Sequence, residues 1–351
     1  MQLLIGTYTS EGGSRGIYAA DWDGYAGKLG DPRLLAEIEN PSFLALAPSR
    51  RLLYAASETG RFKGADSGAV AVIRLSGSGT VTEAMRPSGG TSPCHLAVDP
   101  RGGFLVASNY SSGTAAVFPL TAGQPGDPTV FKLEGHGPDH DRQAGPHAHS
   151  AFFDPTGERF YVQDLGSDRI WGFALDRAAR TARPLDPPFL QLNPGSGPRH
   201  LAFHPRKPWA YVINELDNTV IALAWDRKTG ALAPFQTVKT LPEDISVTSY
   251  CADIHVSSDG TCLYGSNRGH DSIAVWRIDP GEGGLSLVQH ISCGGEHPRS
   301  FVLSPDERWL LCANMNSGNI VVFRRDPRTG ILSNSSAVSS PMPVCLVFLN
   351  S

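Results

Sequence analysis

The chain has 351 residues, of which 40% are hydrophobic and 18% are charged, so it can bury a sizeable core and is not intrinsically disordered. Its formal net charge of -4 argues against a general nucleic-acid or anionic-membrane partner, because both favour a basic protein surface. No stretch approaches the roughly 20 apolar residues that a membrane-spanning helix needs. We therefore expect no nucleic-acid partner and no membrane partner.

The first residues and the cysteines indicate the expected compartment. Residues 1–7 have no basic segment and too short an apolar run for a secretory signal. The cysteines show no C-x-x-C pair and fall inside apolar segments, at positions 94, 251, 262, 293, 312 and 345. This pattern predicts reduced core thiols in a cytoplasmic protein.

One phrase recurs along the chain. A first apolar segment begins near a proline and a polar pair, and a second apolar segment follows a short turn and ends in a polar side chain. The first segments close on Pro or Ser at positions 48, 100, 155, 205, 258 and 305, a period of about 50 residues. Two further apolar runs follow each pair, for example residues 170–175 and 187–192. Four short strands per unit are typical of a β-propeller blade.

The two ends of the chain supply one further blade. Residues 343–348 match a first strand, whereas residues 3–8 match a second strand that has no first strand before it. We predict that the C-terminal strand pairs with the N-terminal strands and closes the ring, which removes exposed sheet edges. The sequence therefore predicts an all-β fold: one seven-bladed β-propeller with four antiparallel strands per blade, as a single domain over residues 1–351.

The polar variation of the repeat falls at two places, the start of the first strand and the end of the second. Antiparallel neighbours bring these places to the same end of a blade, and we expect them to surround one channel mouth as a pocket. Arginines and histidines there suit a small anionic molecule. The candidates are Ser57, Glu58, His95, Asn109, Tyr110, His147, His149, Asp164, Arg199, His200, Asn214, Glu215, Asp253, His255, Asn267, Arg268, His297, Arg299 and Asn314.

At these residues the sequence resembles the lactonase family of seven-bladed propellers, which includes propeller-type 6-phosphogluconolactonases and carboxy-muconate lactonizing enzymes. The resemblance covers essentially the whole chain. The matching phrases are Ile-Gly-Thr-Tyr at 5–8, Pro-His-Ala-His-Ser at 146–150, Gly-Pro-Arg-His at 197–200, Asn-Glu-Leu at 214–216, Ala-Asp-Ile-His at 252–255, Ser-Asn-Arg at 266–268 and His-Pro-Arg at 297–299.

The resemblance implies metal-independent lactone chemistry with four catalytic residues, namely His149, Arg199, Glu215 and Arg268. Lactone hydrolysis needs a base for water, a donor or cation for the oxyanion, and a proton for the departing ring oxygen. A histidine can exchange a proton near neutrality, so we assign that role to His149. Glu215 would orient the water or share the base role, while Arg199 and Arg268 would hold the anion.

We expect further contacts with the substrate from the neighbouring positions, and no cofactor. The expected substrate-binding residues are Asn109, Tyr110, His147, Asp164, His200, His255, His297 and Arg299. We expect the reaction to be hydrolysis of 6-phospho-D-glucono-1,5-lactone to 6-phosphogluconate, a step of the pentose phosphate pathway. We expect a monomer or a weak homo-oligomer.

Several alternatives stay open from the sequence. Arg199 and Glu215 could form only an ion pair between strands, and His147 lies one pleat from His149. Three histidines, His200, His204 and His255, are also consistent with buried core positions. The histidines at 136, 140, 147 and 149, with the aspartates at 139, 141 and 164, have metal-ligand chemistry, although we favour no metal. A muconolactone-type enzyme and a non-enzymatic protein-binding scaffold are the alternative functions.

Overall fold

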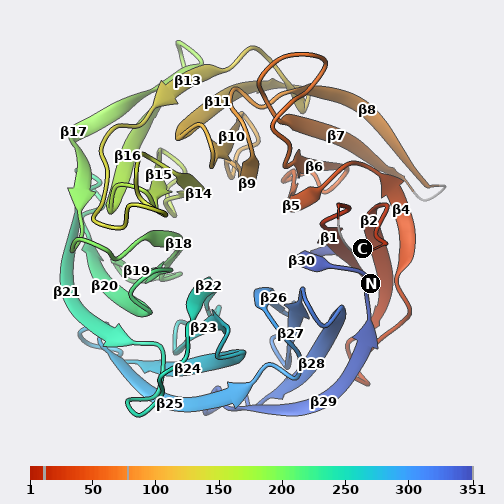
Figure 1. Ribbon diagram of the computed structural model, residues 1–351, viewed down its shortest axis with the longest axis vertical. Coiled ribbons are helices and arrows are strands. Elements are labelled where there is room, and N and C mark those ends of the chain that lie inside the picture. The colour runs from red at the N-terminus through yellow and green to blue at the C-terminus, as the bar shows by residue number, and fades with distance from the viewer. Residues whose placement is uncertain (11–12, 77–78, 350–351) are drawn as a thin grey trace. The chain divides into compact units, whose positions relative to one another are not determined.

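The computed structural model describes residues 1–10, 13–76 and 79–349. Within these ranges the secondary structure consists of β-strands and turns, with no helix and therefore no helix that could cross a membrane. The chain divides into two compact units, which we call the middle unit, residues 35–199, and the terminal unit, residues 1–34 with 200–351. Each unit is a series of antiparallel sheets (Figure 1).

The middle unit contains three sheets. Their strands are β5 (Pro41–Leu46), β6 (Leu52–Ser57), β7 (Ala69–Ser76) and β8 (Gly79–Pro87); β9 (Pro93–Val98), β10 (Phe104–Asn109), β11 (Thr114–Thr121), β12 (Gln124–Pro125) and β13 (Thr129–Lys132); and β14 (Ala148–Phe153), β15 (Arg159–Asp164), β16 (Arg169–Asp176) and β17 (Thr181–Gln191).

The other four sheets belong to the terminal unit, with the unit boundaries falling inside β4 and β18. Their strands are β18 (Pro198–Phe203), β19 (Trp209–Asn214), β20 (Thr219–Trp225) and β21 (Leu232–Lys239); β22 (Tyr250–Val256), β23 (Cys262–Arg268), β24 (Ser272–Ile278) and β25 (Leu285–Ser292); β26 (Pro298–Leu303), β27 (Trp309–Asn314), β28 (Asn319–Arg325) and β29 (Leu332–Ser339); and β30 (Pro343–Leu349), β1 (Gln2–Thr7), β2 (Gly16–Asp23), β3 (Lys28–Leu29) and β4 (Arg33–Glu37).

The last of these sheets joins the two ends of the chain. Strand β30 pairs antiparallel with β1, from Gln2 opposite Leu349 to Gly6 opposite Cys345, and Figure 1 shows the two strands side by side. The predicted pairing of the C-terminal strand with the N-terminal strand is confirmed. In this sheet the fourth strand is split into β3 and β4, and β11 likewise pairs with two short strands, β12 and β13.

The sheets of each unit pack face to face, which explains the apolar character of both strand faces. In the middle unit, Tyr54 and Phe118 belong to a buried cluster between the sheets β5–β8 and β9–β13. In the terminal unit, Tyr211 and Trp276 occupy the corresponding place between β18–β21 and β22–β25. Full burial of one such side chain contributes about 1.5–3 kcal/mol. The fourth strands, by contrast, alternate exposed and half-buried residues, as in β21.

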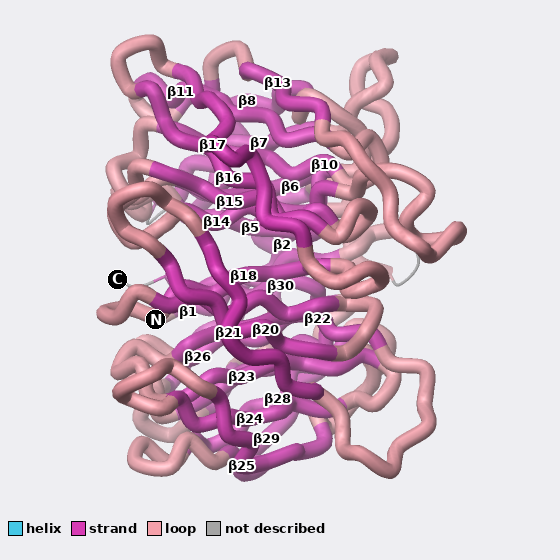
Figure 2. Tube along the Cα trace, turned by 90° about the vertical axis from the view of Figure 1, so that its left-hand side faces the viewer, coloured by secondary structure: helices cyan, strands magenta, loops and turns pink. Residues whose placement is uncertain are grey.

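The strands of each unit, taken by itself, end in loops on two opposite sides (Figure 2). At one of these ends the first residue of the first strand lies opposite the last residue of the second strand. The pairs include Pro93 with Asn109, Ala148 with Asp164 and Pro298 with Asn314. In these sheets the structure therefore confirms that the start of the first strand and the end of the second share one end of the sheet.

Candidate active site

A β-bulge recurs at the second residue of the first strand. In β14 the register steps from Ala148 opposite Asp164 to Ser150 opposite Gln163, so His149 is the extra residue of the bulge. In β26 it passes from Pro298 to Ser300 and skips Arg299 in the same way. A bulge redirects the extra residue and bends the strand, and bulges are common beside active sites. His149 and Arg299 therefore occupy equivalent bulge positions, whereas His147 lies before β14.

The middle unit brings two of the predicted residues, His147 and His149, to the ring of a third, Tyr110. The Tyr110 and His147 rings stack with centroids 4.4 Å apart and planes 9° apart. The His149 ring meets the Tyr110 ring edge-on, with centroids 5.7 Å apart. His147 Nδ1 donates to the Tyr110 carbonyl oxygen at 2.9 Å, which leaves Nε2 of a neutral ring as an acceptor. His149 is buried, so the cluster can fix an imidazole in one orientation.

Asp164 holds the backbone of this cluster through hydrogen bonds to its carboxylate. Its carboxylate is fully buried and accepts hydrogen bonds from the backbone nitrogens of His147, at 2.7 Å, and Gly166, at 3.1 Å, and from Ser167 Oγ and Trp171 Nε1. Burial raises the pKa of Asp164, although these hydrogen bonds act in the opposite direction. The structure thus places Asp164 where it holds the backbone of His147.

Asn109 is the last residue of β10, a position at which other sheets also have an asparagine. Its Nδ2 donates to Thr114 Oγ1 at 3.1 Å and to the Ser88 carbonyl oxygen at 3.1 Å. Equivalent asparagines donate to a side-chain oxygen five residues later, in the pairs Asn214 with Thr219, Asn267 with Ser272 and Asn314 with Asn319. The polar end of the second strand, which we predicted as a ligand position, therefore serves first as a turn anchor.

Two further residues belong to the same end of the middle unit. Arg199 is buried, and its carbonyl oxygen accepts a hydrogen bond from Ser150 Oγ at 2.5 Å. Arg142, which we did not predict, extends Nη2 to within 3.5 Å of Tyr110 Oη. The signal for Arg142 was weak, because it lies in the loop before β14 rather than in the repeated phrase. Arg142 adds a half-buried cation beside the Tyr110 cluster.

The terminal unit holds a buried ion pair at the ends of its second strands. Glu215 follows β19, and Arg268 ends β23. Their Oε2 and Nη2 atoms lie 2.7 Å apart, and the side chains are 4% and 9% exposed. Arg268 also donates to the backbone oxygens of Cys251, at 2.9 Å, and Tyr250, at 3.3 Å. Because Arg268 neutralises Glu215 and is fixed by β22, it orients the carboxylate as well as offering a positive charge.

A second charged group lies along the first strands of the terminal unit. The buried carboxylate of Asp253 bonds to His200 Nδ1 at 2.9 Å through one oxygen and to His255 Nε2 at 3.3 Å through the other. Burial raises the pKa of a carboxyl, but His255 and His200 outweigh it and hold the pKa of Asp253 well below its usual value. Burial lowers the pKa of an imidazole, yet Asp253 raises the pKa of His255. His200 and His255 are thus joined through one carboxylate.

The remaining predicted residues of the terminal unit lie around β26. Arg299 Nη2 donates to Tyr8 Oη at 2.9 Å, and its guanidinium carbon lies 5.3 Å from the centre of the Tyr8 ring. His297 has a positive φ of 62°, and its backbone nitrogen donates to Asp271 Oδ1 at 2.8 Å. His297 therefore defines the turn that leads into Arg299.

His204 takes the core role that the sequence left open. Its Nε2 donates to the Gly260 carbonyl oxygen at 3.1 Å, and its Nδ1 accepts from the backbone nitrogens of Arg206 and Lys207. Burial lowers the pKa of His204. Both ring nitrogens are therefore used to hold the turn after β18.

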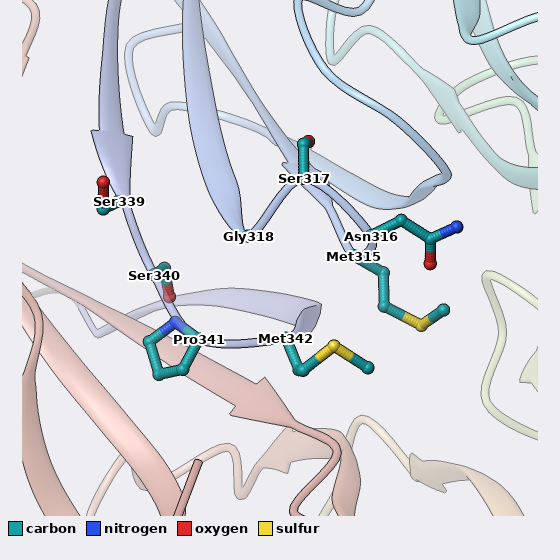
Figure 3. Close-up of a pocket in the computed structure, with 8 residues that line it drawn as sticks. All are labelled: Met315, Asn316, Ser317, Gly318, Ser339, Ser340, Pro341 and Met342. Atoms are coloured by element: carbon teal, nitrogen blue, oxygen red, sulfur yellow. The ribbon is translucent and has the colours of Figure 1, made fainter. Parts of the chain in front are cut away.

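A shallow groove of about 460 Å³ lies at the same strand ends of the terminal unit (Figure 3). Its side chains are uncharged, and the Met315 and Met342 side chains extend in the same direction (Figure 3). The backbone nitrogen of Met315 bonds to the carbonyl oxygen of His297, and the carbonyl oxygen of Met342 accepts from Tyr8. The lining residues are Met315, Asn316, Ser317, Gly318, Ser339, Ser340, Pro341 and Met342.

Asp164 and His147 could have formed part of a metal site but have other hydrogen-bond partners in the structure. Asp164 is occupied by four donors, and His147 Nδ1 bonds to a backbone oxygen. Across residues 1–10, 13–76 and 79–349, no three His, Cys, Asp or Glu side chains are grouped so that they could hold a metal ion. Within the described part of the chain, the histidines at 136–149 are therefore not grouped as ligands of a metal ion.

Comparisons with known proteins agree with the fold and with the motifs. The family model described as "Lactonase, 7-bladed beta-propeller" matches residues 2–348. A 6-phosphogluconolactonase of Bacillus subtilis is 38% identical over 351 residues, covering 99% of this chain and 97% of the relative. A 6-phosphogluconolactonase of Formosa agariphila is 34% identical and covers 94% of each chain.

A solved structure gives the same result. The periplasmic gluconolactonase of Pseudomonas aeruginosa matches with a TM-score of 0.92 and 33% identity, covering 99% of this chain and 98% of that one. The predicted fold class and the family resemblance are both confirmed. With its seven antiparallel sheets as blades, the chain belongs to the family of seven-bladed β-propeller lactonases.

Proposed function

We propose that this protein hydrolyses a sugar lactone, 6-phospho-D-glucono-1,5-lactone, to 6-phosphogluconate. The observation that carries the proposal is the His149 imidazole, set in a β-bulge and oriented by the Tyr110 ring, in a chain that belongs to a lactonase family. Two relatives at 38% and 34% identity are named 6-phosphogluconolactonase. Both match over nearly their whole length.

The reaction needs one proton transfer to begin and one to end. His149 accepts a proton from water as the water oxygen attacks the lactone carbonyl carbon, which forms a tetrahedral oxyanion. The carbon–oxygen bond of the ring then breaks, and the departing ring oxygen takes the proton from the imidazolium. A positioned histidine contributes about 10²–10⁴-fold to such a step. The product acid ionises, so each turnover releases one proton near neutral pH.

The charged residues have roles that follow from their contacts. Arg199 and Arg268 stabilise negative charge, and fixed cations are effective when they need no reorganisation during the reaction. Glu215, held by Arg268 at 2.7 Å, orients water or shares the proton. The proposed substrate contacts remain Asn109, Tyr110, His147, Asp164, His200, His255, His297 and Arg299. Two of them, Asp164 and Asn109, are also bonded to neighbouring backbone groups.

We also propose the cytoplasm as the compartment and the pentose phosphate pathway as the setting. All six cysteines are buried thiols that form no disulfide, as suits a reducing compartment. One solved relative is named a gluconolactonase, whereas two curated relatives are named 6-phosphogluconolactonase. These names differ in the phosphate group of the substrate, which an experiment must therefore examine.

The test compares three lactones with purified protein: 6-phosphogluconolactone, unphosphorylated gluconolactone and a muconolactone. We expect kcat/KM to be highest for the phosphorylated lactone, because arginines bind a phosphate through several charge-assisted hydrogen bonds. Arg299→Met should reduce that preference if Arg299 contacts the phosphate. A higher kcat/KM for gluconolactone or for the muconolactone would overturn the assignment of the substrate.

A further inference from the structure

Asp168 lies in the turn between β15 and β16 and is only 1% exposed. Its φ of 56° is in the left-handed region, where glycine is the residue that fits without strain. The turns at the same place in two other sheets do use glycine, Gly113 and Gly318, with φ of 59° and 61°. The same turn position also holds Asn218 and Asp271, each with a φ of 53°, and Asn and Asp tolerate this region better than other non-glycine residues. The backbone therefore permits an aspartate at position 168 but does not require its buried carboxylate.

The Asp168 carboxylate accepts three hydrogen bonds from two different loops. Oδ1 accepts from Gln143 Nε2 at 2.7 Å and from the Gly197 backbone nitrogen at 2.8 Å. Oδ2 accepts from the Gly195 backbone nitrogen at 2.7 Å. Hydrogen bonds to an ionised acceptor are roughly twice as strong as those between neutral groups.

Both loops lead directly into proposed catalytic residues of the middle unit. Gln143 is buried in the loop that precedes His147 and His149, and its Nε2 also donates to the Leu165 carbonyl oxygen at 2.8 Å. Gly197 lies two residues before Arg199 in the chain. One carboxylate thus connects the segments that carry the proposed base and one proposed anion-binding arginine.

We propose that Asp168 is a positioning residue for lactone hydrolysis, whose carboxylate fixes the two loops from which His149 and Arg199 extend. The proposal rests on the function proposed above. Displacement of a reacting group by about 1 Å can cost about 10²-fold in rate, so an anchor that serves two such groups at once has a large effect without touching the substrate.

The experiment uses two variants of the anchor and one matched control. Asp168→Asn keeps the size of the side chain but turns an NH₂ group toward an N–H donor. Gln143→Ala removes the contact of Asp168 with the His149 loop, together with the Gln143 bonds to Leu165 and Asp139, and keeps the contacts of Asp168 with Gly195 and Gly197. The control is Asp99→Asn: Asp99 is a fully buried carboxylate of the same unit that accepts from the backbone nitrogens of Gly103 and Phe104, at the opposite strand ends.

The kinetic outcomes differ for the two loops. Asp168→Asn should lower kcat about tenfold to a hundredfold and also raise KM for 6-phosphogluconolactone, since both loops lose their anchor. Gln143→Ala should lower kcat with little change in KM. Asp99→Asn should lower the melting temperature with kcat and KM unchanged. Wild-type kcat and KM in folded Asp168→Asn, or an equal kinetic loss in Asp99→Asn, would overturn the proposal.

A readout without turnover separates this proposal from the proposed function. The chain has eleven histidines, whose ring carbons can be isotopically labelled for NMR. The signal of His149 is assigned as the one that is missing from the spectrum of His149→Gln. We expect Asp168→Asn and Gln143→Ala to shift the His149 signal and Asp99→Asn to leave it in place, even if no lactone tested is hydrolysed. An unshifted His149 signal in both anchor variants would contradict the positioning role. If Asp168→Asn does not fold, Gln143→Ala decides.

Discussion

The Tyr110 cluster of the middle unit and the Glu215–Arg268 pair of the terminal unit use equivalent positions of the repeat in different ways. Tyr110 follows β10 and organises two histidines by ring contacts. Glu215 follows β19, Arg268 ends β23, and the two are held by opposite charge. The repeated backbone provides the same position at the end of the second strand in each sheet. The residue at that position determines whether an aromatic ring or a charged side chain is held there.

The difference also affects stability. Ring stacking and hydrogen bonds to the backbone do not require a second charge, so the loss of one ring removes mainly local contacts. A buried ion pair is different, because the removal of one partner leaves an uncompensated charge inside the protein. We therefore expect changes in the middle unit to affect chiefly the reaction, and changes in the terminal unit to affect the reaction and the folded state together.

The largest expected effect on catalysis comes from His149→Gln. This change removes the proposed base but keeps a polar side chain in the bulge of β14. We expect kcat for 6-phosphogluconolactone to fall about 10²–10⁴-fold, with a melting temperature close to that of the wild type. Steady-state kinetics and thermal unfolding check both parts. A kcat within twofold of the wild type would remove His149 from the mechanism.

Breaking the charge pair should have the largest effect on stability. Glu215→Gln leaves the Arg268 guanidinium buried without its partner, which typically costs about 3–5 kcal/mol. The double variant Glu215→Gln, Arg268→Met should regain much of that stability while remaining inactive, because no buried charge is left. Urea unfolding of the two variants measures the difference. Equal stability of wild type and Glu215→Gln would show that the pair does not contribute as its burial indicates.

The smallest expected effect is a pH dependence of stability from the Asp253–His255 contact. The folded-state pKa of His255 is raised, so its contribution is fully present below about pH 6.5, the pKa of a free imidazole, and is lost as the pH rises through the folded-state pKa. The pKa of Asp253 is lowered, so its own contribution is present above about pH 4 and is lost only as the pH falls through the lowered value.

The variant His255→Gln isolates this contact. The melting temperature of this variant should decline less than that of the wild type between pH 6 and pH 9. The difference should be small, because the His255 side chain is 41% exposed and solvent screens its charge. His200 also bonds to Asp253, and His200→Gln serves as the comparison. Parallel pH profiles of wild type and His255→Gln would contradict the assignment.

The sequence predicted the fold because the period of about 50 residues fixes strand pairing within each repeat. It also placed Glu215, Arg268 and His149 at one end of their sheets, since antiparallel pairing brings those positions together. The split fourth strands were not predicted, although Gly30 with Pro32, and Gly126 with Pro128, interrupt the pattern. Proline cannot donate to the ladder, so these residues end one short strand before the next begins.

The bulge at His149 and the pairing of Glu215 with Arg268 could not be predicted. A bulge depends on the register between two strands, which the periodicity does not specify to one residue. The Glu215–Arg268 pair joins the ends of strands in consecutive sheets, and only their packing brings the two side chains to 2.7 Å. Arg142 and Asp168 lie in loops outside the repeated phrase, where side-chain contacts follow from the folded loop alone.

The most direct measurement is the rate of proton release from 6-phosphogluconolactone in weak buffer, compared with the spontaneous rate. We predict strong acceleration by the wild type and a return toward the spontaneous rate for a variant from either unit, His149→Gln or Arg268→Met, while Asp99→Asn stays active. Wild-type protein that releases protons at the spontaneous rate would contradict the proposed activity, and variants as fast as the wild type would contradict the proposed site.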